Sequence, residues 1–111
     1  MNKSSNLKAL MGLGILLVST NIFAVSDAAK IGGNLGAMDY CRDKIASSDD
    51  RGKYNLLKVK ALGEYDDLNS ENKVKALVFK SAAEKGDYLG DPLTKRRCDS
   101  LRKMLFLRYG D

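Results

Sequence analysis

The most informative stretch of this sequence is basic and helix-like: it reads LTKRRCDSLRKMLFLRYGD and covers residues 93–111. On a helical wheel, most of its apolar side chains fall within one arc. They are Leu93, Cys98, Leu101, Met104, Leu105 and Tyr109. A helix with an apolar arc and a charged back normally lies against the core of a folded domain. The stretch therefore predicts a helix over residues 93–109 that packs onto a helical core.

The charged back of this helix is mainly basic, and its cations are Lys95, Arg96, Arg102 and Lys103. Such a face is normally solvated, although a cationic amphipathic helix can also lie on an anionic surface. Arg97 and Arg108 fall inside the apolar arc instead. A buried guanidinium needs a carboxylate, so we expect a buried ion pair at Arg97 with Asp39, Asp66 or Asp67. Arg108 lies in the last turn, where solvent or terminal carbonyl groups can satisfy it.

The chain has two cysteines, Cys41 and Cys98. Two cysteines allow one intrachain pairing, and a bond between them would close a long loop. An intermolecular bridge or a redox role are the alternatives. The sequence has no CxxC pair and no histidine that could lower a thiol pKa. We therefore expect a structural disulfide.

The first 24 residues have the three parts of a secretory signal peptide. Lys3 and Lys8 precede an apolar run from Ala9 to Val18, and small or polar residues follow it. We expect cleavage after Ala24, although a cut as late as Ala29 also satisfies the small-residue rule. An uncleaved anchor is the alternative, but the apolar run is shorter than the roughly 20 residues that span a bilayer. Stable membrane insertion is therefore not expected after cleavage, and the prediction is a periplasmic or secreted protein.

Length and charge narrow the class of protein. The 111 residues suffice for one domain. The whole chain has a net charge of +5, which falls to about +3 once the two signal-region lysines are removed. Acidic residues are scattered throughout and there is no tryptophan, whereas nucleic-acid binding favours a one-signed stripe with stacking aromatics. A nucleic-acid partner is not expected.

Hydrophobic spacing predicts an all-α fold, a compact bundle of about four short helices with the first and last tied by the disulfide. We expect residues 25–33 to be mobile and residues 34–111 to form a single helical domain. The first helix should begin at Asn34, and a third should present Val74, Leu77, Val78, Ser81 and Ala82 to the core. Gly86 should end that third helix. Asp91 and Pro92 should then start the last one.

The expected second helix, residues 51–62, is apolar on more than one side. Tyr54, Leu57 and Ala61 form one stripe, and Leu56, Val59 and Leu62 lie on other faces. Such a helix is either central or has a second contact surface. The three outer residues, with a basic rim from Lys58 and Lys60, are the candidate binding surface for another protein or for a homodimer. The surface would not exist if these three side chains were buried.

Few residues support catalysis. The chain lacks histidine, P-loop and GxSxG motifs, and we expect no metal and no cofactor. The stretch from Asp67 to Glu71 echoes a calcium loop but lacks its glycine and distal glutamate, so it is interpreted as a helix cap. We therefore predict an envelope protein-interaction module such as an inhibitor, an immunity protein or a chaperone. The alternatives are a secreted cationic factor that binds anionic envelope or host surfaces, and a small hydrolase that uses the carboxylates Glu64, Asp66, Asp67 and Glu71.

Overall fold

The computed structural model describes residues 26–110, and the predicted signal peptide, residues 1–24, lies outside them. The described part is an all-α bundle, which confirms the expected fold class. Its elements are α2 (Asp27–Tyr40), a π-helical turn η1 (Cys41–Ile45), α3 (Arg51–Asp66), α4 (Ser70–Glu84), the strands β2 (Asp87–Tyr88) and β3 (Asp91–Pro92), and α5 (Lys95–Tyr109). Within these residues, no helix is long and apolar enough to cross a membrane.

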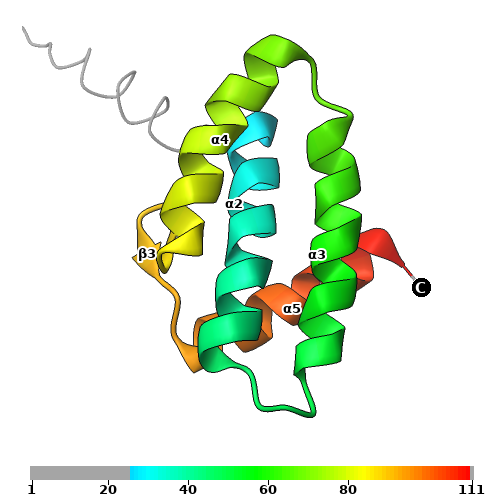
Figure 1. Cartoon of the computed structure of the whole chain (residues 1–111), viewed down its shortest axis with the longest axis vertical. Helices are drawn as coiled ribbons and strands as arrows, with labels where there is room; N and C mark the ends of the chain where they lie inside the picture. The colour runs from blue at the N-terminus through cyan, green and yellow to red at the C-terminus, as the bar shows by residue number, and fades with distance from the viewer. Residues whose placement is uncertain (1–25, 111) are drawn as a thin grey trace, which may run out of the picture.

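Helix α2 occupies the centre of the bundle (Figure 1). It lies between α3 and α4, which contact each other only slightly, and α5 crosses the lower part of the bundle at an angle. The hairpin β2–β3 connects α4 to α5 at one edge. Because α5 covers only part of the bundle, no further element of residues 26–110 packs on the outer sides of parts of α3 and α4.

Helix α2 begins earlier than the sequence predicts. Its N-cap is Ser26, whose hydroxyl accepts a hydrogen bond from the backbone N–H of Ala29 at 3.2 Å. Asn34 is therefore not the cap, and the expectation of a mobile segment over residues 25–33 is wrong for the described residues from 27 onward. Residues 27–33 are mainly alanine and glycine and show no apolar stripe in the sequence. Their packing against α4 nevertheless stabilises the helix.

The contact between α2 and α4 explains why α2 is rich in glycine. A Cβ built on Gly32 would overlap the backbone carbonyl oxygen of Ala76, and one built on Gly36 would overlap that of Lys80. Only glycine allows the two backbones to approach this closely. The glycines therefore set the distance between the two helices.

Helix α4 buries the face opposite to the one that the sequence predicts. It buries the small residues Ala76 and Ala83 against the bundle, whereas Val74, Leu77 and Val78 are 68%, 48% and 64% exposed. The predicted core face of this helix is therefore wrong. The close approach of α2 leaves room for methyl groups but not for larger side chains.

The connection before α5 also differs from the prediction. Gly86 ends α4 in a left-handed conformation, as expected (φ 98°). Asp91 and Pro92, however, form β3, which pairs with β2 through a tight turn. The cap of α5 is Thr94, whose hydroxyl accepts a hydrogen bond from the backbone N–H of Arg97 at 3.2 Å. A helix start at Asp91 and Pro92 is therefore wrong.

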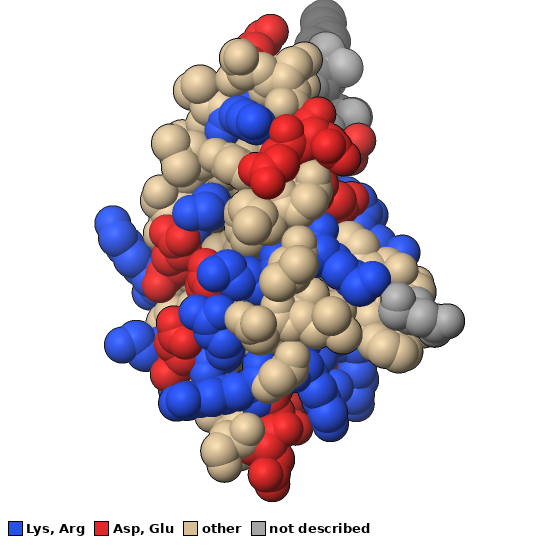
Figure 2. All heavy atoms as spheres, turned by 45° about the vertical axis from the view of Figure 1, so that its right-hand side comes forward, with Lys and Arg blue, Asp and Glu red and all other residues tan. Residues whose placement is uncertain are grey.

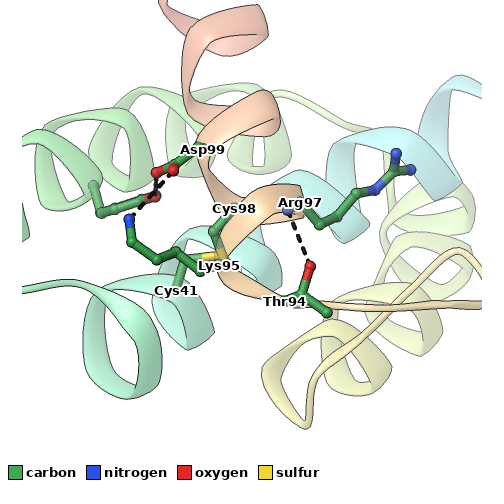
Figure 3. Close-up of a disulfide and its surroundings, with 7 residues drawn as sticks. Cys41, Thr94, Lys95, Arg97, Cys98 and Asp99 are labelled. Carbon is green, nitrogen blue, oxygen red and sulfur yellow. Dashed lines mark hydrogen bonds and ion pairs between the residues drawn. A yellow bond between two sulfur atoms is a disulfide. The ribbon is translucent and has the colours of Figure 1, made fainter.

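The disulfide joins Cys41, at the start of the π-helical turn, to Cys98 on α5, as the sequence predicts (Figure 3). Both cysteines are fully buried in a core that also contains Tyr54, Leu57 and Leu105. Met104 was expected in this core but is 46% exposed. A disulfide of this kind indicates an oxidising compartment.

Candidate protein-interaction surface

The three residues predicted to bind a partner lie on the outer side of α3. Leu56, Val59 and Leu62 are 52%, 57% and 38% exposed, so none of the three is buried by the described part of the chain. Leu56 and Val59 share one face of α3 with two glycines, Gly52 and Gly63. We call these four residues the α3 stripe.

The glycines of the α3 stripe face open space in the part of the chain that the structure describes. A Cβ built on Gly52 or Gly63 meets no atom within 4 Å. A glycine inside a helix costs roughly 0.5–1 kcal/mol relative to alanine, and no close contact within the described residues requires either one. They leave the backbone of α3 accessible for close approach by a second helix.

A hollow of about 250 Å³ lies beside the α3 stripe, between α3 and α5. Its walls are Lys53, Leu56, Leu57, Arg102 and Phe106, and we call it the α3–α5 groove. Phe106 is 54% exposed, although it is one of three phenylalanines in the chain. An aromatic ring at the edge of an apolar hollow is a frequent anchor of a protein interface.

The rim of the α3–α5 groove is basic, but its cations are not the predicted ones. Lys58 is half-buried, and its ammonium lies 3.0 Å from Asp39 on α2; Lys60 is also half-buried. Among the described residues, the charged side chains that line the groove are Lys53 and Arg102, and the ammonium of Lys53 lies 3.5 Å from a carboxylate oxygen of Asp50 beside it. Figure 2 shows many basic side chains beside uncharged surface in its lower half, with acidic side chains at the left edge and at the bottom.

The predicted basic face of α5 is divided by the fold. Lys95 forms an ion pair with Asp99 at 3.3 Å, beside the disulfide (Figure 3). The guanidinium of Arg102 lies over the ring of Tyr54, 5.9 Å from its centroid, and faces the α3–α5 groove. Arg96 and Lys103 remain exposed. The four cations therefore do not act as one surface.

Arg97 does not form the predicted buried ion pair. Its side chain is 42% exposed, and its Nη2 lies 3.5 Å from a carboxylate oxygen of Asp91. The guanidinium also stacks over the ring of Tyr88 at 5.4 Å. The predicted partners were wrong because α5 begins after the hairpin, which places Arg97 in the first turn next to β3.

Arg97 also borders the largest hollow described, of about 420 Å³, where α5 passes α2. Asn34 is buried there, 4% exposed, and accepts a hydrogen bond from the hydroxyl of Tyr88 at 2.8 Å. Both arginines that line this hollow already have carboxylate partners, since Arg108 pairs with Glu64. These contacts stabilise the fold.

The carboxylates considered for hydrolysis do not converge on a cleft. Asp66 and Asp67 are exposed at the end of α3, and Glu71 forms a weak pair with Lys75 at 3.8 Å on α4. None of the hollows described above contains one of them. The residues that the structure describes also include no cluster of three or more potential metal ligands.

Glu64 on α3 instead accepts hydrogen bonds from the last turn of α5. Arg108 donates to it from Nη2 at 2.6 Å, and the hydroxyl of Tyr109 donates at 2.7 Å. Burial alone would raise the pKa of Glu64, but the hydrogen bonds from Arg108 and Tyr109 lower it below its usual value. Burial, reinforced by the bond to Glu64, raises the pKa of the Tyr109 phenol. This clasp favours a charged Glu64 and a neutral Tyr109.

We expect Glu64→Gln to reduce the loss of stability in acid. A carboxyl whose pKa is lowered on folding stabilises the protein above its unfolded pKa, and this contribution disappears as pH falls through the folded pKa. The contribution should be about 1 kcal/mol, because half of Arg108 is exposed and solvent screens the pair. Urea unfolding at neutral pH and near pH 3 measures it.

The matched control for this experiment is Glu71→Gln, because Glu71 is 82% exposed and only weakly paired. It removes a carboxyl group of the same kind without changing the contacts between Glu64, Arg108 and Tyr109. Equal acid sensitivity in the wild type and Glu64→Gln would contradict the stabilising role of the clasp.

Sequence reasoning overlooked Phe106 and Leu107. Leu107 is 81% exposed, and both residues lie outside the apolar arc of residues 93–109. That position on the helical wheel could have identified them, because large apolar residues on the charged face of a helix do not contribute to its core.

Comparison of the chain with protein-family models, with curated proteins and with solved structures yields no match.

Proposed function

We propose that the chain is an exported protein-interaction module that binds an acidic, amphipathic segment of another envelope protein in the α3–α5 groove. The observation that carries the proposal is the groove itself, an apolar hollow between Leu56 and Phe106 whose two charged lining residues are both cations. An amphipathic helix binds such a groove through side chains three and four residues apart. Acidic residues beside those side chains would complement Lys53 and Arg102.

The exposed apolar side chains support binding over a purely structural role. A core position is fully buried, as Tyr54 and Leu57 are on the same helix. Leu56, Val59 and Phe106 each expose about half or more of their surface. Contiguous apolar surface of this kind, rimmed by polar residues, is typical of protein interaction sites. The glycines of the α3 stripe would let a partner helix cross α3 closely.

Export is the second part of the proposal. The disulfide supports an oxidising compartment, and the sequence of residues 1–24 supports a signal peptide. Cleavage after Ala24 leaves the cap Ser26 and the whole of α2 in the mature chain. Cleavage after Ala28 or Ala29 would remove that cap and separate buried residues from α2. We therefore place the cut after Ala24.

A cationic factor for anionic surfaces is supported less well. Its binding would require Lys95, Arg96, Arg102 and Lys103 to act together. Lys95 is paired with Asp99, and Arg102 lies over Tyr54 at the α3–α5 groove. A carboxylate-only hydrolase is likewise less supported, because Glu64 is held in its clasp with Arg108.

The experiment is affinity capture with the oxidised chain, exported through its own N-terminal region and tagged at the C-terminus, from envelope extracts at low and at about 0.5 M salt. Mass spectrometry identifies the retained protein, and the intact mass of the exported chain reports the cleavage position. We expect Leu56→Asp and Phe106→Asp to weaken binding of the retained protein about 30-fold or more each, because each variant places a charge in the apolar groove.

The matched control is Leu107→Asp, the same kind of substitution at an exposed residue of α5 that lies neither in the α3–α5 groove nor on α4. It should leave capture unchanged. Circular dichroism should show that all three variants are folded. The proposal is wrong if the retained protein binds Leu56→Asp and Phe106→Asp as tightly as the wild type. Binding that disappears entirely at high salt would favour the cationic-surface function instead.

A further inference from the structure

Helix α4 presents a second apolar surface, formed by Val74, Leu77 and Val78, which we call the α4 stripe. These side chains are 68%, 48% and 64% exposed, and they face away from Ala76 and Ala83, which contact the bundle. The stripe lies on a different helix from the α3–α5 groove, at the opposite side of α2 (Figure 1).

The exposure of the α4 stripe is fixed by the fold. Rotating α4 to bury it would bring large side chains to the place where Ala76 and Lys80 meet the glycines of α2. That contact has no room for them, because even a Cβ on Gly32 or Gly36 would overlap the backbone of α4. Among residues 26–110 no other element covers these side chains, so a second chain is the contact we consider for them.

The charges at the two ends of the α4 stripe are self-complementary. Glu71 lies in the first turn of α4 and Lys85 directly follows its last residue, and both are exposed. Fourteen positions separate them, which places both on the side of the helix that carries the stripe. An antiparallel second copy with Val78 facing its own counterpart would bring each Glu71 opposite a Lys85.

This pattern distinguishes a second copy from a different partner. A twofold interface uses the same patch on both chains, so any charge at one end of the patch must be complementary to the charge at the other end. The α4 stripe meets that requirement, because its acid and its base exchange places across the twofold axis. The α3–α5 groove does not, since Lys53 and Arg102 would face cations of the same sign.

We propose that the chain forms an antiparallel homodimer through the α4 stripe, independently of any partner bound at the α3–α5 groove. The interface involves one helix from each chain and is small, so the dissociation constant should be about 10–100 µM. Weak self-association of this kind would present two α3–α5 grooves and raise the apparent affinity for a partner with two binding segments.

Sedimentation equilibrium of the oxidised chain from about 1 to 500 µM tests the proposal. Val78→Asp should abolish dimerisation in this range, because it places two carboxylates opposite each other at the twofold axis. The matched control is Val59→Asp on α3, where exposure is similar, 57% against 64%; it should leave the dimer unchanged.

A charge exchange tests the antiparallel pairing directly. Glu71→Lys and Lys85→Glu should each weaken the dimer at least about threefold, because each places like charges at both ends of the interface. The double variant should restore wild-type affinity, since it reverses both pairs. Far-ultraviolet circular dichroism confirms that each variant is folded.

Three results would overturn the proposal. One is a wild-type chain that remains monomeric at the highest concentration. Another is a dimer that Val59→Asp dissociates and Val78→Asp does not. The third is a double variant no stronger than either single one, which would exclude the Glu71–Lys85 pairing. None of these results depends on capture at the α3–α5 groove, so the two proposals can fail separately.

Discussion

Gly32→Ala should lower the free energy of unfolding by about 3 kcal/mol or more, a large share of the stability of so small a domain. The added methyl group would overlap the carbonyl oxygen of Ala76 and approach its carbonyl carbon to 2.7 Å and its Cα to 2.9 Å. These atoms belong to the backbone of α4, so no side-chain rotation can relieve the overlap. The helices would have to separate and lose contact along their length.

Urea unfolding followed by circular dichroism measures the change. The matched control is Gly63→Ala, the same substitution at an exposed position inside α3 where no atom lies within 4 Å of the new methyl group. It should raise stability by roughly 0.5–1 kcal/mol, because alanine favours the helix. Equal effects of the two substitutions would show that the α2–α4 contact does not limit the size of residue 32.

Cys41→Ala combined with Cys98→Ala should lower the free energy of unfolding by about 4 kcal/mol. The bond joins residues 57 positions apart, and its loss increases the conformational freedom of the unfolded chain. Alanine is preferred to serine in this test because both cysteines are fully buried, and a buried hydroxyl would add its own cost.

Reduction of the wild type provides an independent measurement. Dithiothreitol should lower its stability to about that of the double variant, whose unfolding should not respond to the reductant. A loss below about 1 kcal/mol in the double variant would contradict a major stabilising role for the bond. The core is small, so the domain depends on this cross-link more than a larger one would.

The fold class followed from the sequence because local signals agreed. The apolar arc of residues 93–109 and the stripe at Tyr54, Leu57 and Ala61 both pointed to helices, and both supply core residues in the structure. Two cysteines gave one intrachain pairing. Gly86 follows the end of α4 in a left-handed conformation, as expected for a glycine at a helix C-terminus.

Two of the wrong predictions, the start of α2 and the buried face of α4, have one physical origin, the contact between α2 and α4. Glycine at positions 32 and 36 is a poor helix former, so the sequence indicated a mobile segment at the first of them. Tertiary packing reverses that preference, because glycine is the residue that lets the helices touch. The same contact determines which face of α4 is buried, so that Ala76 rather than Leu77 faces the core.

The candidate surface was only partly accessible to sequence reasoning. Leu56 and Val59 could be identified because they lie off the core stripe of their own helix. The roles of Lys58 and Arg97 could not be identified, because their partners Asp39 and Asp91 belong to other elements. Arg102 likewise required the packing of α5 on α3, which places its guanidinium over Tyr54.

The glycine contact separates two kinds of selection on this chain. A change at Gly32 or Gly36 would be eliminated by unfolding, whatever the protein binds. The monomer places no such demand on Leu56, Val78 or Phe106, where a polar residue would favour solubility. Among natural variants of the chain, large apolar residues retained at these three positions would therefore record selection for association, distinct from selection for folding.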